Sequence, residues 1–172
     1  KFNPDAVIPR EMLEKIVKAA RSAPTGMNKQ EISFYVATGA TVHEIGRETE
    51  AMALPKYPHL QARKDQFGCE NAVTYGATAL LVLTFKAELA AWAMIDAGFA
   101  AHAVLIAAHE LGLGAVPVGI AGMVNEAGIK AKLHIPDDEK VAVTIPVGVP
   151  DPEYAVKWRP AKELVSKVAW IP

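Results

Sequence analysis

The sequence contains a single cysteine, Cys69, among 172 residues. One cysteine excludes an internal disulfide, a Cys-x-x-Cys redox pair and a zinc site built on cysteines. Cys69 lies in a mixed-charge stretch that offers no obvious activating partner, so we expect no nucleophile there. Scarcity of cysteine is also typical of a reducing compartment, and we therefore expect a cytoplasmic protein.

A strong excess of charge is lacking as well. The chain has 18 Lys and Arg against 19 Asp and Glu, and its basic residues are scattered rather than clustered. Nucleic-acid binding needs a basic patch, so we expect no nucleic-acid partner. His102 and His109 are seven residues apart, two helical turns, which is too far for joint metal ligation, and we expect no metal.

Hydrophobic residues are abundant, at 51% of the chain. A chain of this length and composition forms one domain with a sizeable core, and no linker or repeat divides residues 1–172. One apolar run, Leu89–Ala108, is long enough to cross a bilayer. Asp96 and His102 lie inside it, and a charge in the bilayer centre is costly. We therefore expect a buried helix of a soluble domain and no membrane partner.

Local patterns predict alternating helices and strands. Apolar spacing and turn residues predict, in order, a helix over 10–22, a strand over 32–38, a helix capped by Thr41 and ending near Ala53, a loop-rich or mobile stretch over 54–69, a buried strand within 74–85, a long helix over 87–112, a strand over 115–120, a short helix over 125–133, a strand over 140–149 and an extended arm over 150–172. This order indicates a mixed α/β or α+β domain. Because the long helix is apolar around most of its circumference, a second subunit is a plausible cover for it.

The loop Pro24–Gln30 is the first stretch whose residue types indicate chemistry. The amides of Asn28 and Gln30 both donate and accept hydrogen bonds, which suits the edge of a planar heteroaromatic ring. Gly26 allows backbone to approach a ligand closely. An ordinary connection from helix to strand uses the same residue types, so the loop alone does not decide between the two interpretations.

The second stretch follows the long helix. Its glycines do not form a dinucleotide-binding fingerprint, because Pro117 stands where the third glycine is needed and the glycines follow a helix instead of opening one. They fit a helix end and a tight entry into a strand. Alternatively, this backbone lies against a flat ligand, with Val118 and Gly119 offering their N–H groups to a ring atom.

The third stretch is Lys157-Trp158-Arg159 in the arm. Alternate residues of an extended segment share a face, so Lys157 and Arg159 point the same way. Two cations on one face form an anion site suited to a phosphate group. A solvated basic patch is the alternative.

Taken together, the three stretches resemble the FMN-dependent nitroreductase family in order and spacing. The family signature is matched by Ala19-Ala20-Arg21-Ser22-Ala23-Pro24-Thr25-Gly26-Met27-Asn28-Lys29-Gln30, by Ile95-Asp96-x-Gly98-x-Ala100, by Leu111-Gly112-Leu113-Gly114 and by Ile145-Pro146-Val147-Gly148-x-Pro150. Glu31-Ile32 stands where the family usually has Pro-Trp. The family's Arg-x-Ser-x-Arg run, which grips FMN, would fall just before Lys1-Phe2.

The resemblance implies an α+β, nitroreductase-like three-layer α-β-α fold with a mixed or antiparallel sheet, a long central helix and a C-terminal arm. It also implies a domain-intertwined homodimer with FMN at the subunit interface. Carried over to this sequence, the flavin-binding residues are Pro24, Thr25, Gly26, Asn28, Gln30, Asn71, Pro117, Val118, Gly119, Lys157 and Arg159. Asn71 would contact the pyrimidine edge, Pro117–Gly119 the ring with one N–H at flavin N5, and the two cations the phosphate.

By the same resemblance, the protein is an oxidoreductase in which NADH or NADPH passes a hydride to flavin N5. An electron-poor small molecule, such as a nitroaromatic or a quinone, then takes the electrons in a ping-pong cycle. No catalytic side chain is required, since the cofactor carries the chemistry. Two alternatives stay open: a flavoenzyme of the same fold with other chemistry, such as dehalogenation or oxidation of a ring or peptide, and a non-enzymatic flavin-binding module.

Overall fold

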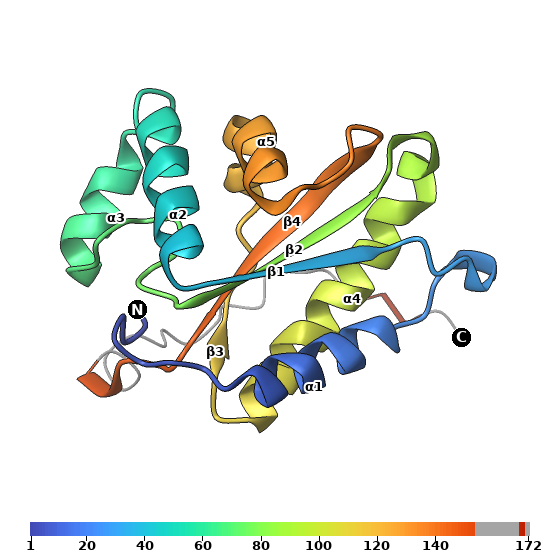
Figure 1. The fold of residues 1–172 in the computed structure, drawn as a ribbon, viewed down its shortest axis with the longest axis horizontal. Helices are drawn as coiled ribbons and strands as arrows, with labels where there is room; N and C mark the ends of the chain where they lie inside the picture. The colour runs from blue at the N-terminus through green and yellow to red at the C-terminus, as the bar shows by residue number, and fades with distance from the viewer. Residues whose placement is uncertain (154–168, 171–172) are drawn as a thin grey trace.

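A four-stranded sheet lies between two layers of helices in the computed structural model, which describes residues 1–153 and 169–170 (Figure 1). The strand order is β1-β2-β4-β3, and each pairing is antiparallel. The strands are β1 (Ser33–Thr38), β2 (Ala79–Lys86), β3 (Gly114–Ala115) and β4 (Glu139–Gly148). The sheet is therefore antiparallel, one of the two arrangements that the resemblance implied.

The central strand β2 confirms the prediction from its continuous apolar run. Every residue from Ala79 to Phe85 is buried. Leu81 lies opposite Val36 of β1 on one side and Ile145 of β4 on the other. A strand that has neighbours on both edges and helices on both faces has no solvated side, which is why its sequence does not alternate.

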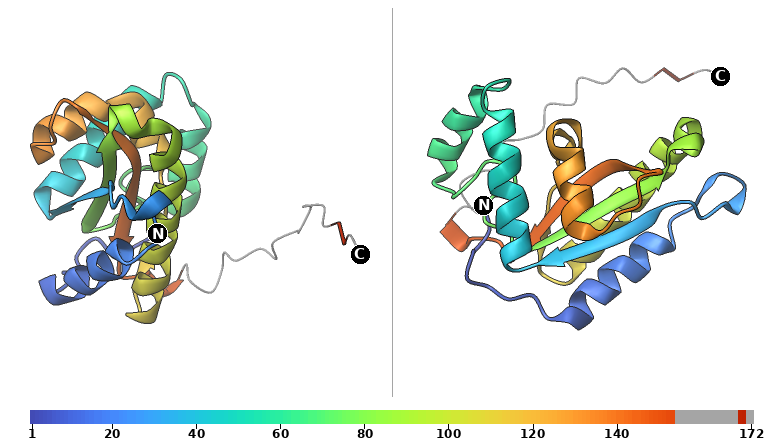
Figure 2. Two further views of the ribbon diagram at one scale, coloured as in Figure 1. Left: turned by 90° about the vertical axis from the view of Figure 1, so that its right-hand side faces the viewer. Right: turned by 45° about the horizontal axis from the view of Figure 1, so that its top comes forward.

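The two helical layers cover opposite faces of the sheet (Figures 1 and 2). One layer contains α1 (Arg10–Arg21) and α4 (Ala90–Glu110), and the other contains α2 (Ala40–Ala53) and α5 (Gly119–Leu133). The short 3-10 helices are η1 (Gly26–Asn28) and η2 (Ala87–Leu89). The three-layer α-β-α arrangement agrees with the predicted fold class.

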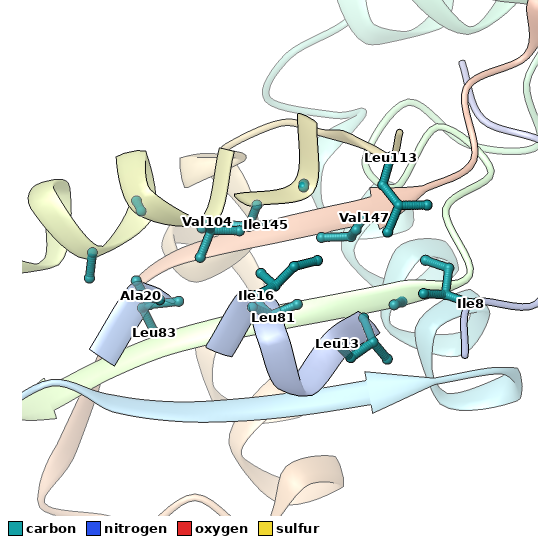
Figure 3. Close-up of a cluster of buried hydrophobic side chains, with 14 residues drawn as sticks. Ile8, Leu13, Ile16, Ala20, Leu81, Leu83, Val104, Leu113, Ile145 and Val147 are labelled. Carbon is teal, nitrogen blue, oxygen red and sulfur yellow. The ribbon is translucent and has the colours of Figure 1, made fainter. Parts of the chain in front are cut away.

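The larger core lies between α1, α4 and the sheet (Figure 3). Its members come from α1, α4, β2, β4 and the segments next to them, and include Ile8, Leu13, Ile16, Ala20, Leu81, Leu83, Val104, Leu113, Ile145 and Val147. Full burial of one such side chain stabilises the fold by about 1.5–3 kcal/mol. A second core, under α2 and α5, includes Val42, Ile45, Val82 and Ile129.

Helix α4 is buried on one side only, whereas the sequence predicted a buried helix. Small residues on that side, including Ala93, Ala97, Ala100 and Ala108, are buried, and α1 and the sheet pack against the helix. Among the residues that the structure describes, one helical segment, Trp92–Glu110, is long enough and apolar enough to cross a membrane, judged by length and composition alone. The solvent side of the helix keeps several large apolar residues.

The stretch predicted to be loop-rich contains a helix, α3 (His59–Phe67). Its one buried apolar residue is Leu60, so the sequence shows little amphipathic pattern. A buried carboxylate holds the region instead. Glu50 of α2 accepts a hydrogen bond from Lys64 Nζ at 2.9 Å and another from the Ala72 N–H at 2.8 Å. These tertiary contacts are not visible in a local pattern.

Two boundaries differ from prediction. Gly39, not Thr41, is the N-cap of α2, and its φ of 61° lies in the left-handed region that favours glycine. The expected strand over 115–120 is reduced to Gly114–Ala115, because α5 already begins at Gly119 instead of Asn125. Asn125 marks a kink inside α5, where its Nδ2 donates to Thr49 Oγ1 at 3.1 Å.

Stability at alkaline pH should depend on Cys69. Burial raises the pKa of this thiol above its ordinary value of 9.0. The folded state therefore keeps a proton that the unfolded chain releases, so the stability present below pH 9 is lost as pH rises through the raised pKa. We expect Cys69→Ala to flatten the fall in unfolding free energy above pH 9 by up to about 1.4 kcal/mol per pH unit. Urea unfolding between pH 7 and 11 measures this slope.

Cys69→Ser is the matched control, since a hydroxyl preserves a donor toward the Asn71 carbonyl, which the thiol reaches at 3.1 Å, but does not titrate in this range. Both variants should flatten the slope to the same extent, however much each of them lowers the free energy of unfolding at pH 7. An unchanged slope in both would contradict the assignment.

Candidate functional site

The loop Pro24–Gln30 connects α1 to β1 in an unusual backbone conformation. Met27, Asn28 and Gln30 all have positive φ values of 53–54°, although none is glycine. Such residues cost free energy and persist only where other contacts fix them, often at ligand sites. The loop is therefore held in a defined shape, and the contacts that hold it identify its supporting residues.

The main support for the loop comes from α4, far along the chain. The Gly26 N–H donates to Asp96 Oδ2 at 2.8 Å, and Asp96 is only 4% exposed. Within the loop, the Gln30 N–H donates to Thr25 Oγ1 at 3.0 Å. The sequence analysis placed Asp96 inside a helix expected to be buried but did not identify a partner for it. The carboxylate fixes the start of the loop against the long helix.

The amides of the loop face solvent. Asn28 and Gln30 are both exposed, and Gln30 Nε2 donates to Asn28 Oδ1 at 3.3 Å, which orients the two side chains together. A hollow of about 380 Å³ adjoins the loop. It is lined by Lys18, Ala20, Arg21, Ser22, Thr25, Gln30, Ile32, Phe34 and Ala100. The loop thus presents an oriented pair of amides beside an open, partly apolar surface.

The second predicted stretch, Pro117–Gly119, is only partly available to a ligand. The Val118 N–H donates to the Thr144 carbonyl at 2.7 Å, and Thr144 Oγ1 donates to the Val118 carbonyl at 2.8 Å. Val118 is therefore tied to β4, and its N–H is not free for a flavin ring, contrary to our expectation. Pro117 and Gly119 are exposed, and Gly119 begins α5. The N–H groups of a helix's first turn have no partner within the helix.

The two stretches lie at opposite edges of the sheet in one chain: the loop leads into the edge strand β1, and Val118 pairs with Thr144 of β4 on the edge that β3 occupies. The loop follows α1 and contacts α4, whereas Pro117–Gly119 leads from β3 into α5. No hydrogen bond within the described ranges 1–153 and 169–170 joins them. A single copy therefore does not assemble them into one pocket.

Asn71 has a structural position. Its side chain is 2% exposed, and Oδ1 accepts hydrogen bonds from the Val73 N–H at 3.0 Å, the Thr74 N–H at 2.7 Å and Thr74 Oγ1 at 3.1 Å. This amide closes a buried turn before β2 and packs against Gly46 of α2. We leave Asn71 out of the proposed flavin site, because its carbonyl group is already engaged inside the domain.

Lys157 and Arg159 lie outside the described residues, so their pairing on one face stays a prediction from sequence. Among the residues that the structure describes, no group of three His, Cys, Asp or Glu side chains is arranged to hold a metal ion. Both His102 and His109 are exposed on α4.

Two acidic residues near the start of β1 have buried carboxylates, and sequence reasoning singled out only the position of Glu31. Glu139 is 8% exposed and accepts hydrogen bonds from the hydroxyls of Ser33, Tyr35 and Thr84. Glu31, which replaces the family's proline, has both carboxylate oxygens buried and without a hydrogen-bond partner in the described structure. The departure from Pro-Trp was the only available signal, and it pointed to Glu31 alone.

Comparison with known proteins agrees with the fold. The model of the nitroreductase family matches residues 1–149. Iodotyrosine deiodinase of Thermotoga neapolitana is 27% identical over 149 residues, which cover 83% of this chain and 78% of that protein.

Solved structures show the same fold. A nitroreductase with bound FMN from Desulfitobacterium hafniense DCB-2 superposes with a TM-score of 0.78 at 21% identity, covering 100% of this chain and 92% of that one. The FMN and NADPH-dependent nitroreductase NfnB from Sphigopyxis sp. strain HMH gives 0.76 at 19% identity, with 99% and 93% covered. The family match over most of the chain is decisive: this protein belongs to the nitroreductase family.

Proposed function

We propose that this protein is an FMN-dependent oxidoreductase that uses NADH or NADPH to reduce an electron-poor small molecule, such as a nitroaromatic or a quinone. Bound FMN would accept a hydride from the nicotinamide and deliver the electrons to the acceptor in a second, separate step. The observation that carries the proposal is the Pro24–Gln30 loop, whose strained backbone is fixed by Asp96 and whose amides are exposed. Membership of the nitroreductase family supports it.

The residues present fit a flavin in chemical terms. Asn28 and Gln30 offer donors and acceptors suited to the polar edge of a heteroaromatic ring. Gly119 offers a first-turn N–H next to Pro117, which presents a flat apolar surface. Lys157 and Arg159 would hold the phosphate through charge-assisted hydrogen bonds, which are among the stronger ones. These groups bind and orient; none has to transfer a proton.

The arrangement favours a homodimer with one flavin at each end of the interface. One copy keeps the Pro24–Gln30 loop and the Pro117–Gly119 turn at opposite edges of its sheet. A second copy could bring its loop next to the turn of the first, which would complete the site. The apolar solvent side of α4 provides the surface for such an association.

The visible absorbance spectrum of the purified protein tests the proposal most directly. We expect a flavin spectrum that bleaches on anaerobic addition of NADH or NADPH and returns when a quinone is added. A flavin that stays oxidised would refute the nicotinamide donor while keeping the cofactor. A colourless protein that fails to take up added FMN would refute the enzyme proposal and favour a non-enzymatic module.

Reductive dehalogenation is the second candidate. It is favoured by the likeness to a protein named iodotyrosine deiodinase, at 27% identity over most of the chain. The two candidates share the flavin and differ in the acceptor. Release of halide from an iodophenol by the reduced protein, with slow turnover of quinones, would favour dehalogenation; rapid quinone turnover without halide release would exclude it as the main activity.

Replacing Arg159 tests the phosphate assignment. We expect Arg159→Ala to raise the dissociation constant for FMN about tenfold or more, because a charge-assisted contact to phosphate contributes about 1.5–3 kcal/mol. Fluorescence titration of the apoprotein with FMN measures the change. The exposed Lys15 on α1 supplies a control of equal charge, since Lys15→Ala should leave the constant unchanged. Equal retention of FMN by both variants would show that the phosphate binds elsewhere.

A further inference from the structure

The hollow beside the Pro24–Gln30 loop contains one residue that departs from the family pattern. Its wall includes Ile32, at the position where the family usually has tryptophan. An isoleucine side chain is smaller than an indole, so it leaves space that a tryptophan would take up. The hollow measures about 380 Å³, within the range of about 300–1,000 Å³ that is typical of small-molecule sites. The replacement therefore gives this chain room for a ligand beside the loop.

The most buried part of the hollow is apolar. Ala20 is 1% exposed and Ala100 is 2% exposed, and both line the hollow with small side chains. Ile32 and Phe34 line it as well and pack against the larger core. Small residues leave room for a ring, and the phenyl group of Phe34 offers a stacking or edge contact to it. This surface suits a flat aromatic group.

Two cations line the same hollow. Lys18 and Arg21 are three residues apart on α1, so their side chains are neighbours on the helix surface. Both are exposed, and neither has an ion-pair partner within the described ranges 1–153 and 169–170. Among the described residues that line the hollow, none is acidic. An aromatic ligand seated here therefore meets uncompensated positive charge.

The carbonyl groups at the end of α1 do not engage these two cations. Basic side chains near a helix C-terminus often bind its last carbonyl groups. Here the Lys18 carbonyl accepts a hydrogen bond from Ser22 Oγ at 3.0 Å. The carbonyls of Ala19 and Ala20 accept from the N–H groups of Ser22 and Ala23, at 3.1 and 3.2 Å. The ammonium and guanidinium groups keep their donors for a ligand.

The position of the hollow favours the electron acceptor over the nicotinamide donor as its ligand. Thr25 and Gln30 line the hollow and belong to the loop proposed to contact the flavin. A ring seated there lies next to the flavin, as an acceptor must. The adenosine end of NADH or NADPH is separated from the reacting nicotinamide by two phosphates, so it does not have to lie there. Asp96, which supports the loop, is not among the lining residues.

We propose that this hollow is an acceptor subsite and that it selects aromatic acceptors with an acidic group, such as a carboxylate, on the ring; this deepens the proposed function and rests on it. The ring lies over Ala20 and Ala100, and the carboxylate binds Lys18 and Arg21. The planar guanidinium matches a carboxylate with two parallel hydrogen bonds, and the ammonium adds a point charge. These residues select and orient the acceptor, and they exchange no electron or proton with it.

The rates with 4-nitrobenzoate and 4-nitrobenzamide test the selection, because the two compounds share a ring and a nitro group and differ in charge. The double variant Lys18→Met/Arg21→Met gives the ratio of their kcat/KM values without the two cations. We expect the native ratio of acid to amide to be about tenfold higher, since two exposed ion pairs contribute a few-fold each. In about 0.5 M salt, which screens such pairs, the native advantage should fall to about twofold or less.

Lys15→Met is the matched control for charge. Lys15 is exposed on the same helix and does not line the hollow, so this variant should keep the native ratio and its salt dependence. A ratio that is equal in the native protein and the double variant would overturn the proposal. A double variant that instead changes the ratio of kcat/KM for NADPH and NADH, with the acid-to-amide ratio unmoved, would overturn it too and would assign the cations to the 2′-phosphate of NADPH.

Ile32→Trp tests the space without turnover. Calorimetric titration of the oxidised protein, as purified, measures the dissociation constant of 4-nitrobenzoate. We expect the larger side chain to raise this constant about tenfold or more by filling the hollow, because a packed site cannot take extra volume without displacement. Ile32→Val, the control that leaves the space open, should change it less than about threefold. Equal affinity in the tryptophan variant and the native protein would show that the ring binds elsewhere.

The outcomes separate this inference from the proposed function. A protein that binds 4-nitrobenzoate through the two cations but takes up no FMN supports the hollow as a site for aromatic acids and refutes the enzyme proposal. A flavin-containing protein that reduces both acceptors with a ratio insensitive to salt and to the double variant overturns the inference alone.

Discussion

Asp96→Ala should weaken FMN binding at least tenfold. The substitution removes the one acceptor that the structure gives to the Gly26 N–H, at 2.8 Å, on the loop proposed to contact the flavin. Hydrogen bonds from a backbone N–H to a charged acceptor contribute about 1.5–3 kcal/mol, and here that energy holds three residues with positive φ in place. Once the support is lost, part of the binding free energy must be spent on ordering the loop. Titration of the apoprotein with FMN measures the loss.

Asp96→Asn is the conservative variant. Its side-chain oxygen can still accept from Gly26, so most of the affinity should return, although the charge is gone. Hydrogen exchange of the Gly26 amide gives a readout that needs no flavin: protection should be lost in the alanine variant and retained in the asparagine variant. Glu110→Ala, at the exposed end of the same helix, should change neither quantity. Equal FMN affinity in the alanine and native proteins would remove Asp96 from any role in positioning the loop.

The sequence predicts those parts of the fold in which a long local pattern of apolar residues shows which side chains are buried. The apolar run of β2 and the amphipathic spacing of α1 each specify one element and one buried face. Helix α3 could not be predicted in this way, because Leu60 is its only buried apolar residue and Glu50 of α2 holds its neighbourhood. Contacts between distant segments decide such an element, and no window of neighbouring residues contains them.

The same difference between local patterns and distant contacts applies to the candidate site. Residue types predicted the Pro24–Gln30 loop as a candidate site, because its amides, proline and glycine suit a flat polar ligand. They did not identify its support, since Asp96 lies 70 residues further along the chain. The prediction for Val118 was wrong for the opposite reason. The sequence suggested that its N–H is free to bind a ligand, but this N–H donates to the Thr144 carbonyl of β4. Composition thus shows which groups could bind a ligand, and only the fold shows which of them are already engaged.

Glu139→Ala should destabilise the fold by about 3–5 kcal/mol. The carboxylate is 8% exposed and accepts from hydroxyls on two neighbouring strands, Ser33 and Tyr35 of β1 and Thr84 of β2. Its removal leaves three donors beside a cavity, of which Thr84 is buried and Ser33 and Tyr35 are partly buried. A loss of this size is a large fraction of the 5–15 kcal/mol that holds a typical domain together. Urea unfolding at pH 7 measures it, and Lys140→Ala, an exposed neighbour, is the control.

A compensating variant tells a polar network from a packing defect. If the cost comes from unpaired hydroxyls, then Glu139→Leu combined with Tyr35→Phe and Thr84→Val should regain at least half of the loss, because no donor except Ser33 is then left without an acceptor. If the cost comes from lost volume, Glu139→Leu alone should regain as much.

Tyr35 supplies an independent readout: burial, and then the charge of Glu139, raises the pKa of its phenol. The stability that this phenol contributes is therefore present below pH 10 and lost above it, and Glu139→Gln should reduce that alkaline loss while Tyr35→Phe abolishes it.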